Sequence, residues 1–387
     1  MQSAYRLQSL NLEGFRVYQN LSLALDKDLT LLIGENGIGK TSILEAIAMA
    51  GNLRSFRRAA DKDMISAASK FYGVTLSYQL LDKTETLRFA YGQDFDGGIS
   101  RRSMTINNQK VGSVNEFLGR FKVVVFSPDD TDIIDRSPKE RRQFFDSLLC
   151  TLYPGYLKSL QSYNRVLLQR NIALKKNANL DEILLLSFDR ELAIHGVEIS
   201  QRRKELCGSF AEFFNQNVEA ISDSKDSWNI EYHDSVQGAD STQAYLDGLQ
   251  QVRANDRRLK QTTKGIHRDR FYFYPGNGPR LELQQFASQG QKRTVALALK
   301  MAQYQLILSQ TNCRPVLLID DVLNELDLNR REKFLSFLSG IGQAIITTTE
   351  LKGLESFLEE LSTLKSSQVY EITKDENGPL VNSALPA

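Results

Sequence analysis

The stretch Leu29-Thr30-Leu31-Leu32-Ile33-Gly34-Glu35-Asn36-Gly37-Ile38-Gly39-Lys40-Thr41-Ser42 decides the fold of this chain. It begins as a short apolar strand, continues as a glycine-rich turn, and leads into an apolar helical pattern that ends near Gly51. Residues 34–41 fit G-x-x-x-x-G-K-[ST] in the strand–loop–helix context that this motif requires. A chance glycine turn followed by Lys-Thr is the alternative, but it accounts for neither the strand nor the helix. The stretch therefore predicts a phosphate-binding loop (P-loop) of a nucleotide site.

Each residue type in this loop has a chemical purpose. Glycines let backbone N–H groups curl around phosphates without Cβ clashes, and the following helix presents its positive end to the same anion. Lys40 is expected to act in catalysis by contacting the β- and γ-phosphates, and the Thr41 hydroxyl to bind Mg²⁺. The predicted nucleotide-contacting residues of the loop are Gly34, Glu35, Asn36, Gly37, Ile38, Gly39, Lys40 and Thr41.

Composition places the chain among ordinary globular proteins. Its 387 residues are enough for two lobes, and 41% hydrophobic with 25% charged residues is a common balance. No apolar run approaches the roughly 20 residues that span a bilayer, and the N-terminus lacks the apolar core of a signal peptide. We therefore expect a cytoplasmic protein without a membrane partner. Because the net charge is only +1, any nucleic-acid site must come from local clusters of basic residues.

The predicted secondary structure changes twice along the chain. Strand patterns dominate to residue 126, helical periodicity follows from about 137 to 220, and strand patterns return after Gly265, including Arg270–Tyr274 and Leu281–Leu283. A parallel α/β pattern with a final helix–strand pair completes the chain. We predict a nucleotide-binding α/β lobe formed by 1–126 and 265–387, and an inserted, mainly helical lobe at 127–264.

An acidic pair follows a buried-type strand late in the chain. Asp320 ends the apolar run 315–319, 280 residues after Lys40, where α/β sheets place ligands and where an acidic residue holds Mg²⁺. Asp321 is the candidate for polarising the attacking water. The alternative is that the pair only caps the next helix. Asn324-Glu325-Leu326-Asp327 is either an acidic loop of the site or such a cap.

A second candidate phosphate contact opens a helix about 30 residues before Asp320. Ser288, Gly290 and Gln291 combine a hydroxyl, a glycine backbone and a helix N-terminus, which together suit a γ-phosphate. Ser-x-Gly before a helix is common, so the position relative to the acidic pair carries this interpretation. We expect these residues to contact the nucleotide.

These parts resemble the ATPase heads of the ABC/SMC class in type and order. The resemblance implies an α/β ABC-type ATPase head, with a P-loop β-sheet lobe and an inserted, mainly helical second lobe. In that class each ATP site is completed by the signature loop of a second molecule. The resemblance therefore implies an ATP-dependent homodimer with ATP and Mg²⁺ as ligands. Thr347-Thr348-Thr349 stands where transport-type members carry a switch histidine.

Within this class the sequence resembles the RecF family of bacterial replication and repair proteins nearly end to end. The chain departs from the family pattern at Ile266 and Arg270, around His267-Arg268-Asp269, and at Asn324, where the family usually has Ser. No lobe-bridging glutamine is identified. The segments that carry the resemblance are 34–47, 54–57, 126–130, 137–146, 168–171, 267–269, 287–294 and 317–322.

The RecF resemblance implies a function for this chain. It implies ATP-dependent binding to single- and double-stranded DNA at gaps and strand junctions, weak DNA-stimulated ATP hydrolysis, and loading of RecA together with RecO and RecR. An ATP-gated scaffold that recruits partner proteins, with only secondary DNA contact, is the alternative. A transporter ATPase subunit is a third interpretation, disfavoured by the missing switch histidine.

Basic clusters are the candidate DNA contacts. Phosphate contacts of this kind bind without sequence preference and weaken with salt, although a solvated charged face is an equally good explanation for any one arginine. Arg141 and Arg142 are expected to pair with Asp or Glu of their own lobe, and His267 fits a core residue as well as a phosphate sensor. The predicted DNA contacts are Arg54, Arg57 and Arg58 beyond the P-loop helix, and Arg257 and Arg258.

Overall fold

The computed structural model describes residues 3–93, 100–176, 181–222, 227–276, 281–349, 366–375 and 378–384. The chain divides into two compact units, Met1–Asp130 with Lys300–Ala387 and Thr131–Leu299. The mixed α/β architecture with a mainly helical insertion, as predicted from the sequence, is confirmed. In the part of the chain just given, no helix is both long and apolar enough to cross a membrane.

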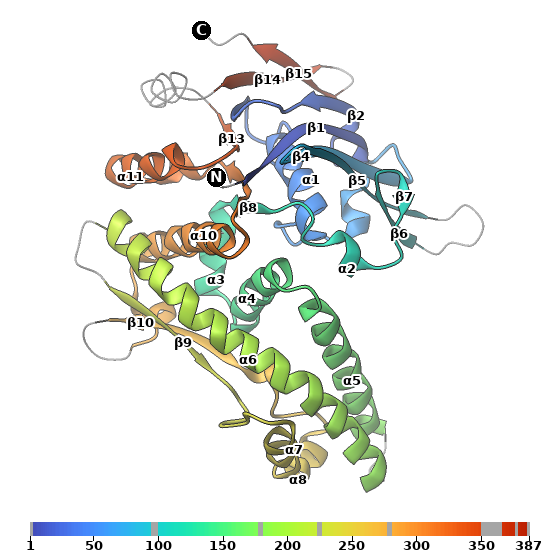
Figure 1. Ribbon diagram of the computed structural model, residues 1–387. Helices are drawn as coiled ribbons and strands as arrows, with labels where there is room; N and C mark the ends of the chain where they lie inside the picture. Colours follow the sequence, from blue (N-terminus) through green and yellow to red (C-terminus); the bar gives the residue numbers. More distant parts are fainter. Residues whose placement is uncertain are drawn as a thin grey trace. The chain divides into compact units, whose positions relative to one another are not determined.

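Two β-sheets build the first unit (Figure 1). One is largely antiparallel, in the order β11-β1-β4-β5-β6-β7 with β2 paired to β1, and the other has a parallel core in the order β15-β14-β3-β13-β12-β8. The strands of the first sheet are β1 Ser3–Phe15, β2 Tyr18–Ala24, β4 Phe71–Leu80, β5 Lys83–Gln93, β6 Ser100–Ile106, β7 Gln109–Lys110 and β11 Cys313–Arg314. Those of the second are β3 Leu29–Ile33, β8 Val123–Phe126, β12 Val316–Asp320, β13 Ala344–Thr348, β14 Ser367–Asp375 and β15 Gly378–Ala384.

Helix α1 (Lys40–Asn52) packs between these sheets and contacts strands of both. Every residue from Ser42 to Gly51 is buried, as expected for a helix that is apolar on all sides. Leu44 and Ile47 belong to one continuous core that also contains Val74 of β4 and Leu318 of β12. Burying a side chain of this size contributes about 1.5–3 kcal/mol, so this core fixes the helix N-terminus and the loop before it.

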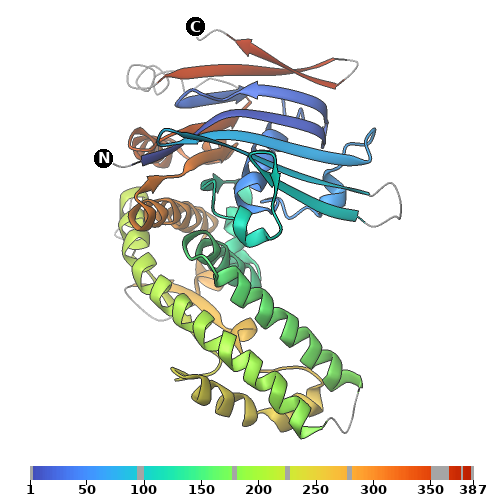
Figure 2. The same cartoon turned by 45° about the vertical axis from the view of Figure 1, so that its right-hand side comes forward.

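The second unit is built on long helices (Figures 1 and 2). Helix α4 begins where Pro138 predicts, with the Ser137 hydroxyl accepting a hydrogen bond from the Lys139 N–H. Helices α5 and α6 run side by side in both views. The elements of this unit are α3 Asp132–Asp135, α4 Pro138–Leu152, α5 Tyr156–Lys176, α6 Glu182–Ile221, β9 Trp228–His233, α7 Thr242–Gln250, α8 Arg253–Leu259, η3 Ile266–Arg268, β10 Arg270–Pro275, α9 Leu283–Phe286 and the first half of α10 Gln289–Thr311.

The boundaries between the two units lie at different residues from those that the sequence predicts. Residues 265–299 belong to the second unit, because β10 pairs antiparallel with β9 over residues 270–275 and Asp269 forms an ion pair with Arg203 of α6. The predicted strand at 281–283 is wrong, since Leu283 begins the short helix α9. The predicted final helix lies outside the described residues.

Short elements of the first unit complete the fold. Asp327 caps α11 (Leu328–Ser339) by accepting a hydrogen bond from the Arg330 N–H, so the capping interpretation of this acidic residue is confirmed. The remaining elements are η1 Asp61–Met64, α2 Val114–Phe117 and η4 Val322–Glu325, with η2 Pro128–Thr131 at the unit boundary.

Candidate nucleotide site

The P-loop connects β3 to α1 and is closely packed on two sides. A Cβ on Gly34 would lie 2.4 Å from the Ile372 carbonyl oxygen of β14, and a Cβ on Gly39 would lie 2.7 Å from the Tyr18 hydroxyl of β2. Gly37 and Gly39 have φ of 78° and 123°, which side chains adopt only with strain. The glycines of the motif are therefore required by the neighbouring strands as well as by any phosphate.

Lys40 lies across the loop that precedes it. Its Nζ donates hydrogen bonds to the carbonyl oxygens of Gly34 (2.6 Å) and Glu35 (3.0 Å), and the residue is 3% exposed. Burial lowers the pKa of Lys40, while the carboxylates of Asp321 and Asp320 act in the opposite direction. The ammonium group is thus held inside the curve of the loop, close to both acidic residues.

A hydrogen bond joins the two halves of the predicted site across most of the chain length. The Thr41 hydroxyl donates to Asp320 Oδ1 at 2.8 Å, and the Thr347 hydroxyl of β13 donates to the same oxygen at 3.0 Å. Burial raises the pKa of Asp320, and these two hydrogen bonds oppose that shift. Thr347, the first residue of the threonine run, therefore positions the acidic side chain at the end of β12.

Asp321 has an unusual backbone and an unsatisfied side chain. Its φ is 50°, in the left-handed region that Asp and Asn tolerate better than most residues, and its N–H donates to the Thr347 hydroxyl at 3.0 Å. Its Oδ1 is buried without a hydrogen-bond partner in the described part of the chain. A buried, unpaired carboxylate oxygen needs a polar partner, and a water molecule can supply one.

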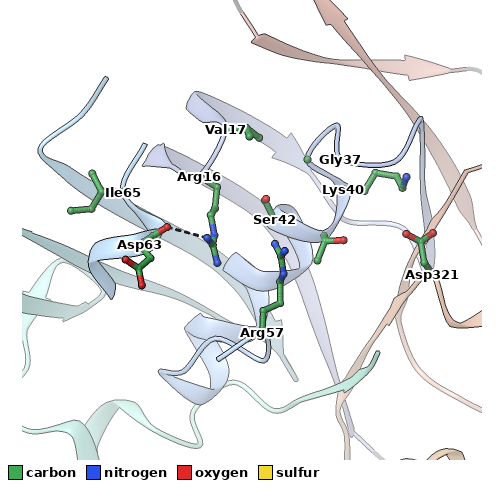
Figure 3. A pocket seen from close by; sticks show the side chains of 11 residues that line it. Arg16, Val17, Gly37, Lys40, Ser42, Arg57, Asp63, Ile65 and Asp321 are labelled. Carbon is green, nitrogen blue, oxygen red and sulfur yellow. Dashed lines mark hydrogen bonds between the residues drawn. The ribbon is translucent and has the colours of Figure 1, made fainter. Parts of the chain in front are cut away.

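Lys40, Thr41 and Asp321 line a cavity of about 450 Å³ in the first unit (Figure 3). Lys40 and Asp321 lie at one end, and Asp63 and Ile65 at the other. Arg57, for which the sequence predicts DNA contact, lines this cavity, and its charge opposes the rise in the pKa of Asp320. The cavity is lined by Arg16, Val17, Gly37, Gly39, Lys40, Thr41, Ser42, Arg57, Asp63, Ile65 and Asp321.

Arg16 is a site residue that sequence reasoning missed. It lies in the turn between β1 and β2, and both ends of its guanidinium bind the buried carboxylate of Glu45 on α1 at 2.8 Å. A third hydrogen bond goes to the Asp63 carbonyl oxygen at 3.0 Å. No motif marks residues 16, 63 and 65, because only the packing of the β1–β2 turn and η1 beside α1 brings them together.

The predicted signature residues form the start of α10 in the second unit. The Ser288 hydroxyl accepts a hydrogen bond from the Gln291 N–H (3.2 Å), and Gln291 Oε1 accepts one from the Ser288 N–H (3.0 Å). This reciprocal pair is a capping box, which fixes the helix N-terminus. Ser288 is exposed, with Gly290 half-buried beside it. The segment therefore presents an ordered helix end to solvent.

The predicted DNA-contacting clusters differ in how their charges are used. Arg54 and Arg58 are exposed near the end of α1. On α8, by contrast, Arg257 forms an ion pair with Glu182, and the neighbouring Arg253 pairs with Asp189 and Glu182. Arg257 thus has a carboxylate partner inside its own unit, whereas Arg258 is exposed and donates to the Asn255 side-chain oxygen.

Two further residues singled out in the sequence have internal roles in the second unit. Arg141 is buried and forms an ion pair with Glu282, so its expected pairing is confirmed, although the partner lies beyond the predicted lobe boundary. Arg142 instead donates to the Asp269 carbonyl oxygen at 2.8 Å. His267 donates from Nε2 to the Thr262 carbonyl oxygen (3.1 Å) and accepts at Nδ1 from the Tyr163 hydroxyl (3.1 Å). Burial lowers the pKa of His267 to about 4, so the imidazole is neutral at pH 7.

The donor set beside the P-loop fits a small divalent cation. Mg²⁺ takes oxygen ligands, and the Thr41 hydroxyl and Asp320 carboxylate are oxygen donors in direct contact. Thr41 and Asp320 would hold this ion, which supplies positive charge that stabilises phosphate oxygens when bound.

Comparison with known proteins assigns the chain to a family. The sequence profile described as the RecF/RecN/SMC N terminal domain matches residues 6–373. The chain is 34% identical to the DNA replication and repair protein RecF of Leptospira interrogans over 374 residues, which cover 97% of this chain and 99% of that protein. It is 35% identical to RecF of Streptococcus suis over 370 residues, covering 94% and 99%. The chain belongs to the RecF family.

Solved structures agree with this family assignment. The RecF-family chain matches the structure described as "the recombination mediator protein RecF-ATP in RecFOR pathway" with a TM-score of 0.86 and 28% identity, over 99% of this chain and 100% of that one. A structure of the same protein as RecF-ATPrS gives a TM-score of 0.86 at 27% identity, over 99% of both chains. An SMC head matches with a TM-score of 0.56 at 16% identity, which supports the shared ATPase-head fold. The RecF-family chain thus has the predicted ABC-type head architecture.

Proposed function

We propose that this chain binds Mg-ATP in the cavity beside the P-loop and hydrolyses it slowly. The observation that carries the proposal is the hydrogen bond between Thr41 and Asp320, because it joins two motifs that are useful together only at a nucleotide site. The cavity of about 450 Å³ beside this bond has the size of a small-molecule site. The RecF-ATP structure named above supports ATP as the nucleotide.

In this proposal each side chain at the phosphate end has one role. Lys40 exchanges its hydrogen bonds to Gly34 and Glu35 for contacts with the β- and γ-phosphates. Asp321 orients the attacking water through Oδ1 and accepts its proton. Arg57 adds positive charge near Asp320, where charge develops on the phosphates.

The opposite end of the cavity would receive the nucleoside. Ile65 offers apolar surface there, and Asp63 offers a carboxylate that can accept hydrogen bonds. This division of the cavity follows from the P-loop, because the loop and the α1 N-terminus fix where the phosphates lie.

We further propose that ATP joins two copies of the chain. The capped N-terminus of α10 exposes Ser288 and lies in a different unit from the cavity-lining residues, so its part in a nucleotide site rests on the family resemblance. In ABC/SMC heads this segment completes the site of a partner molecule. Ser288, Gly290 and Gln291 would then contact the γ-phosphate in trans.

The wider role that we propose is in recombinational repair and replication restart in the cytoplasm. The ATP-bound dimer would hold single- and double-stranded DNA at gaps and strand junctions, with DNA stimulating its slow hydrolysis, and would help to load RecA together with RecO and RecR. The support is the RecF membership and the RecFOR pathway named for the matching structures.

The deciding experiment measures molecular mass by light scattering for the Asp321→Asn variant with Mg-ATP and with Mg-ADP. A dimer with ATP alone supports the shared-site mechanism, and a monomer with both nucleotides contradicts it. DNA retention by the same sample separates the two functional candidates. An ATP-dependent dimer that binds partner proteins but not DNA would favour the scaffold.

A further inference from the structure

Helix α5 carries a row of unpaired positive charge. Its 21 residues include no acidic side chain, and Lys158, Arg165, Lys175 and Lys176 are all exposed. None of these four has an ion pair or hydrogen bond to another described residue. The segment 177–180 that follows contains no acidic residue in its sequence. A positive charge of this kind is available to a partner.

Four carboxylates near α5 serve its buried face. Asp146 accepts from the Tyr156 hydroxyl, and Glu198 accepts from the Ser159 hydroxyl. Asp189 and Asp256 both form ion pairs with Arg170, which is completely buried. Two exposed carboxylates follow the α5–α6 connection, but Asp181 caps the start of α6 and Glu182 pairs with Arg253 and Arg257, so their described contacts are not with the row.

The row follows a single line along the helix. Lys158, Arg165 and Lys176 are seven and eleven residues apart, which at 3.6 residues per turn places them within about 40° of one another around the helix axis. At about 1.5 Å per residue they span roughly 27 Å.

Helix stability does not explain this arrangement. Lys175 and Lys176 suit the negative end of the helix dipole, but Lys158 lies in the first turn, where a positive charge is unfavourable.

From this placement we infer that α5 binds the phosphate backbone of duplex DNA. The inference rests on the proposed DNA-binding function and names the surface that performs it. A duplex carries about one negative charge per 1.7 Å of its axis, so a rigid basic row of this length meets several phosphates at once. The α8 cluster predicted from the sequence offers less free charge, because Arg257 is already paired with Glu182 and only Arg258 of the two predicted residues is exposed without an ion pair among the described residues.

Leu168 and Ile172 are also exposed, at 62% and 42%, and Ile172 lies on the line of the row, seven residues after Arg165. Apolar side chains between cations also occur on surfaces that bind acidic proteins. The absence of carboxylate partners for these cations among the described residues favours DNA, and an acidic protein partner is an explicit outcome of the test.

The test compares two double variants of the full chain in the presence of ATP. Arg165→Gln with Lys176→Gln removes two charges of the row. Arg202→Gln with Lys204→Gln removes two exposed charges of α6 that form ion pairs with Glu205 and Asp240. Affinity is measured for a duplex of about 30 base pairs and for a single strand of equal length. The salt concentration is varied between about 0.05 and 0.3 M, because phosphate contacts weaken as salt increases.

The inference predicts a specific change in salt dependence. Each phosphate contact contributes about −0.9 to the slope of log K against log salt, so the α5 variant should lose about 1.8 from the wild-type slope. At 0.15 M salt this corresponds to roughly 30-fold weaker duplex binding. The α6 variant should bind as the wild type does, and both variants should retain ATP binding.

Other outcomes overturn the inference. Unchanged duplex binding by the α5 variant would exclude this surface, and a loss confined to the single strand would exclude the duplex assignment. Unchanged DNA binding with loss of an acidic protein partner would reassign the surface to that partner. If the wild-type chain itself fails to bind DNA, the proposed function fails, and the inference fails with it.

Discussion

Lys40 is the residue on which nucleotide binding depends most directly, because its ammonium group already lies inside the curve of the P-loop. Replacing it with methionine keeps the length of the side chain and removes the charge. We expect Lys40→Met to weaken ATP binding by at least about 100-fold, since a charge-assisted contact to phosphate in a partly buried site contributes about 3 kcal/mol. Titration calorimetry with ATP measures this, with exposed Lys62→Met as the matched control. Normal affinity in Lys40→Met would contradict the P-loop assignment.

Substitution of Asp321, the proposed catalytic base, tests ATP hydrolysis apart from ATP binding. Asparagine tolerates the left-handed backbone found at this position, so Asp321→Asn should fold normally. Because the carboxylate is the proposed base, we expect normal ATP binding with turnover reduced by about 100-fold or more. Phosphate release under single-turnover conditions provides the measurement. Unchanged turnover would move the base to another residue.

His267 couples the stability of the second unit to pH. Its pKa is lowered to about 4 in the folded chain, below the value of about 6.5 in an unfolded one, so the unfolded state binds more protons between these values. The stabilisation is fully present above pH 6.5 and is lost as the pH falls towards 4. As the pH falls from 6.5 to 4, the free energy of unfolding of the wild type should decrease by about 3 kcal/mol more than that of His267→Gln.

Urea unfolding measured by the fluorescence of Trp228 tests this prediction. Trp228 is the only tryptophan of the chain, and it is buried in β9 of the same unit as His267. Subtracting the unfolding free energy of the variant from that of the wild type at each pH removes the contribution of the titratable groups that both proteins share. Parallel curves for wild type and variant from pH 7 to pH 4 would show that the imidazole is not held neutral.

At the level of elements, the start of α10 allows dimerisation to be tested apart from ATP binding. Ser288→Arg adds bulk and charge at the proposed trans contact and removes the helix cap, which costs about 1 kcal/mol. Ser288→Asn keeps a capping oxygen and is the matched control for that loss. Ser288→Arg should bind ATP and remain a monomer in light scattering. A normal ATP-dependent dimer would contradict the signature assignment.

Local patterns predicted elements well where the sequence itself contains the decisive residues. Pro138 and Ser137 mark the start of α4, and the apolar run before Asp320 marks β12. The boundary at 265 could not be found in this way, because β10 joins the second unit through non-local contacts, such as its pairing with β9 some 40 residues earlier. The segment 281–283 has a strand-like pattern in the sequence. In the structure Glu282 forms an ion pair with the buried Arg141, and helix α9 begins at the next residue, Leu283.

In the candidate site, too, residues in local motifs could be predicted from the sequence, and residues brought in by long-range contacts could not. The P-loop, Asp320 and Asp321 could be identified because their motifs are local and chemically specific. Arg16 could not, since its partner Glu45 lies 29 residues away and nothing in the sequence marks the pairing. Arg57 has a local basic cluster around it, but only the fold shows that its side chain lines the cavity.

For the whole molecule, the two units give a test of where ATP acts. All residues that line the cavity belong to the first unit. In the Ser288→Arg background, ATP at 100 times its dissociation constant should stabilise that unit by about 2.7 kcal/mol. Differential scanning calorimetry should show a higher melting temperature for one transition, while the transition reported by Trp228 stays constant. A parallel shift of both would show that the units unfold together.

The position of β3 in its sheet has a consequence for how the chain is made. Both of its neighbours, β13 and β14, come from residues after 343, and Asp320 is also late in the chain. During synthesis the P-loop leaves the ribosome early, but the strands that flank it are translated more than 300 residues later. A nascent chain therefore has no finished ATP site. The order of translation itself would delay the proposed ATP-dependent dimerisation until the late strands of this sheet have been made.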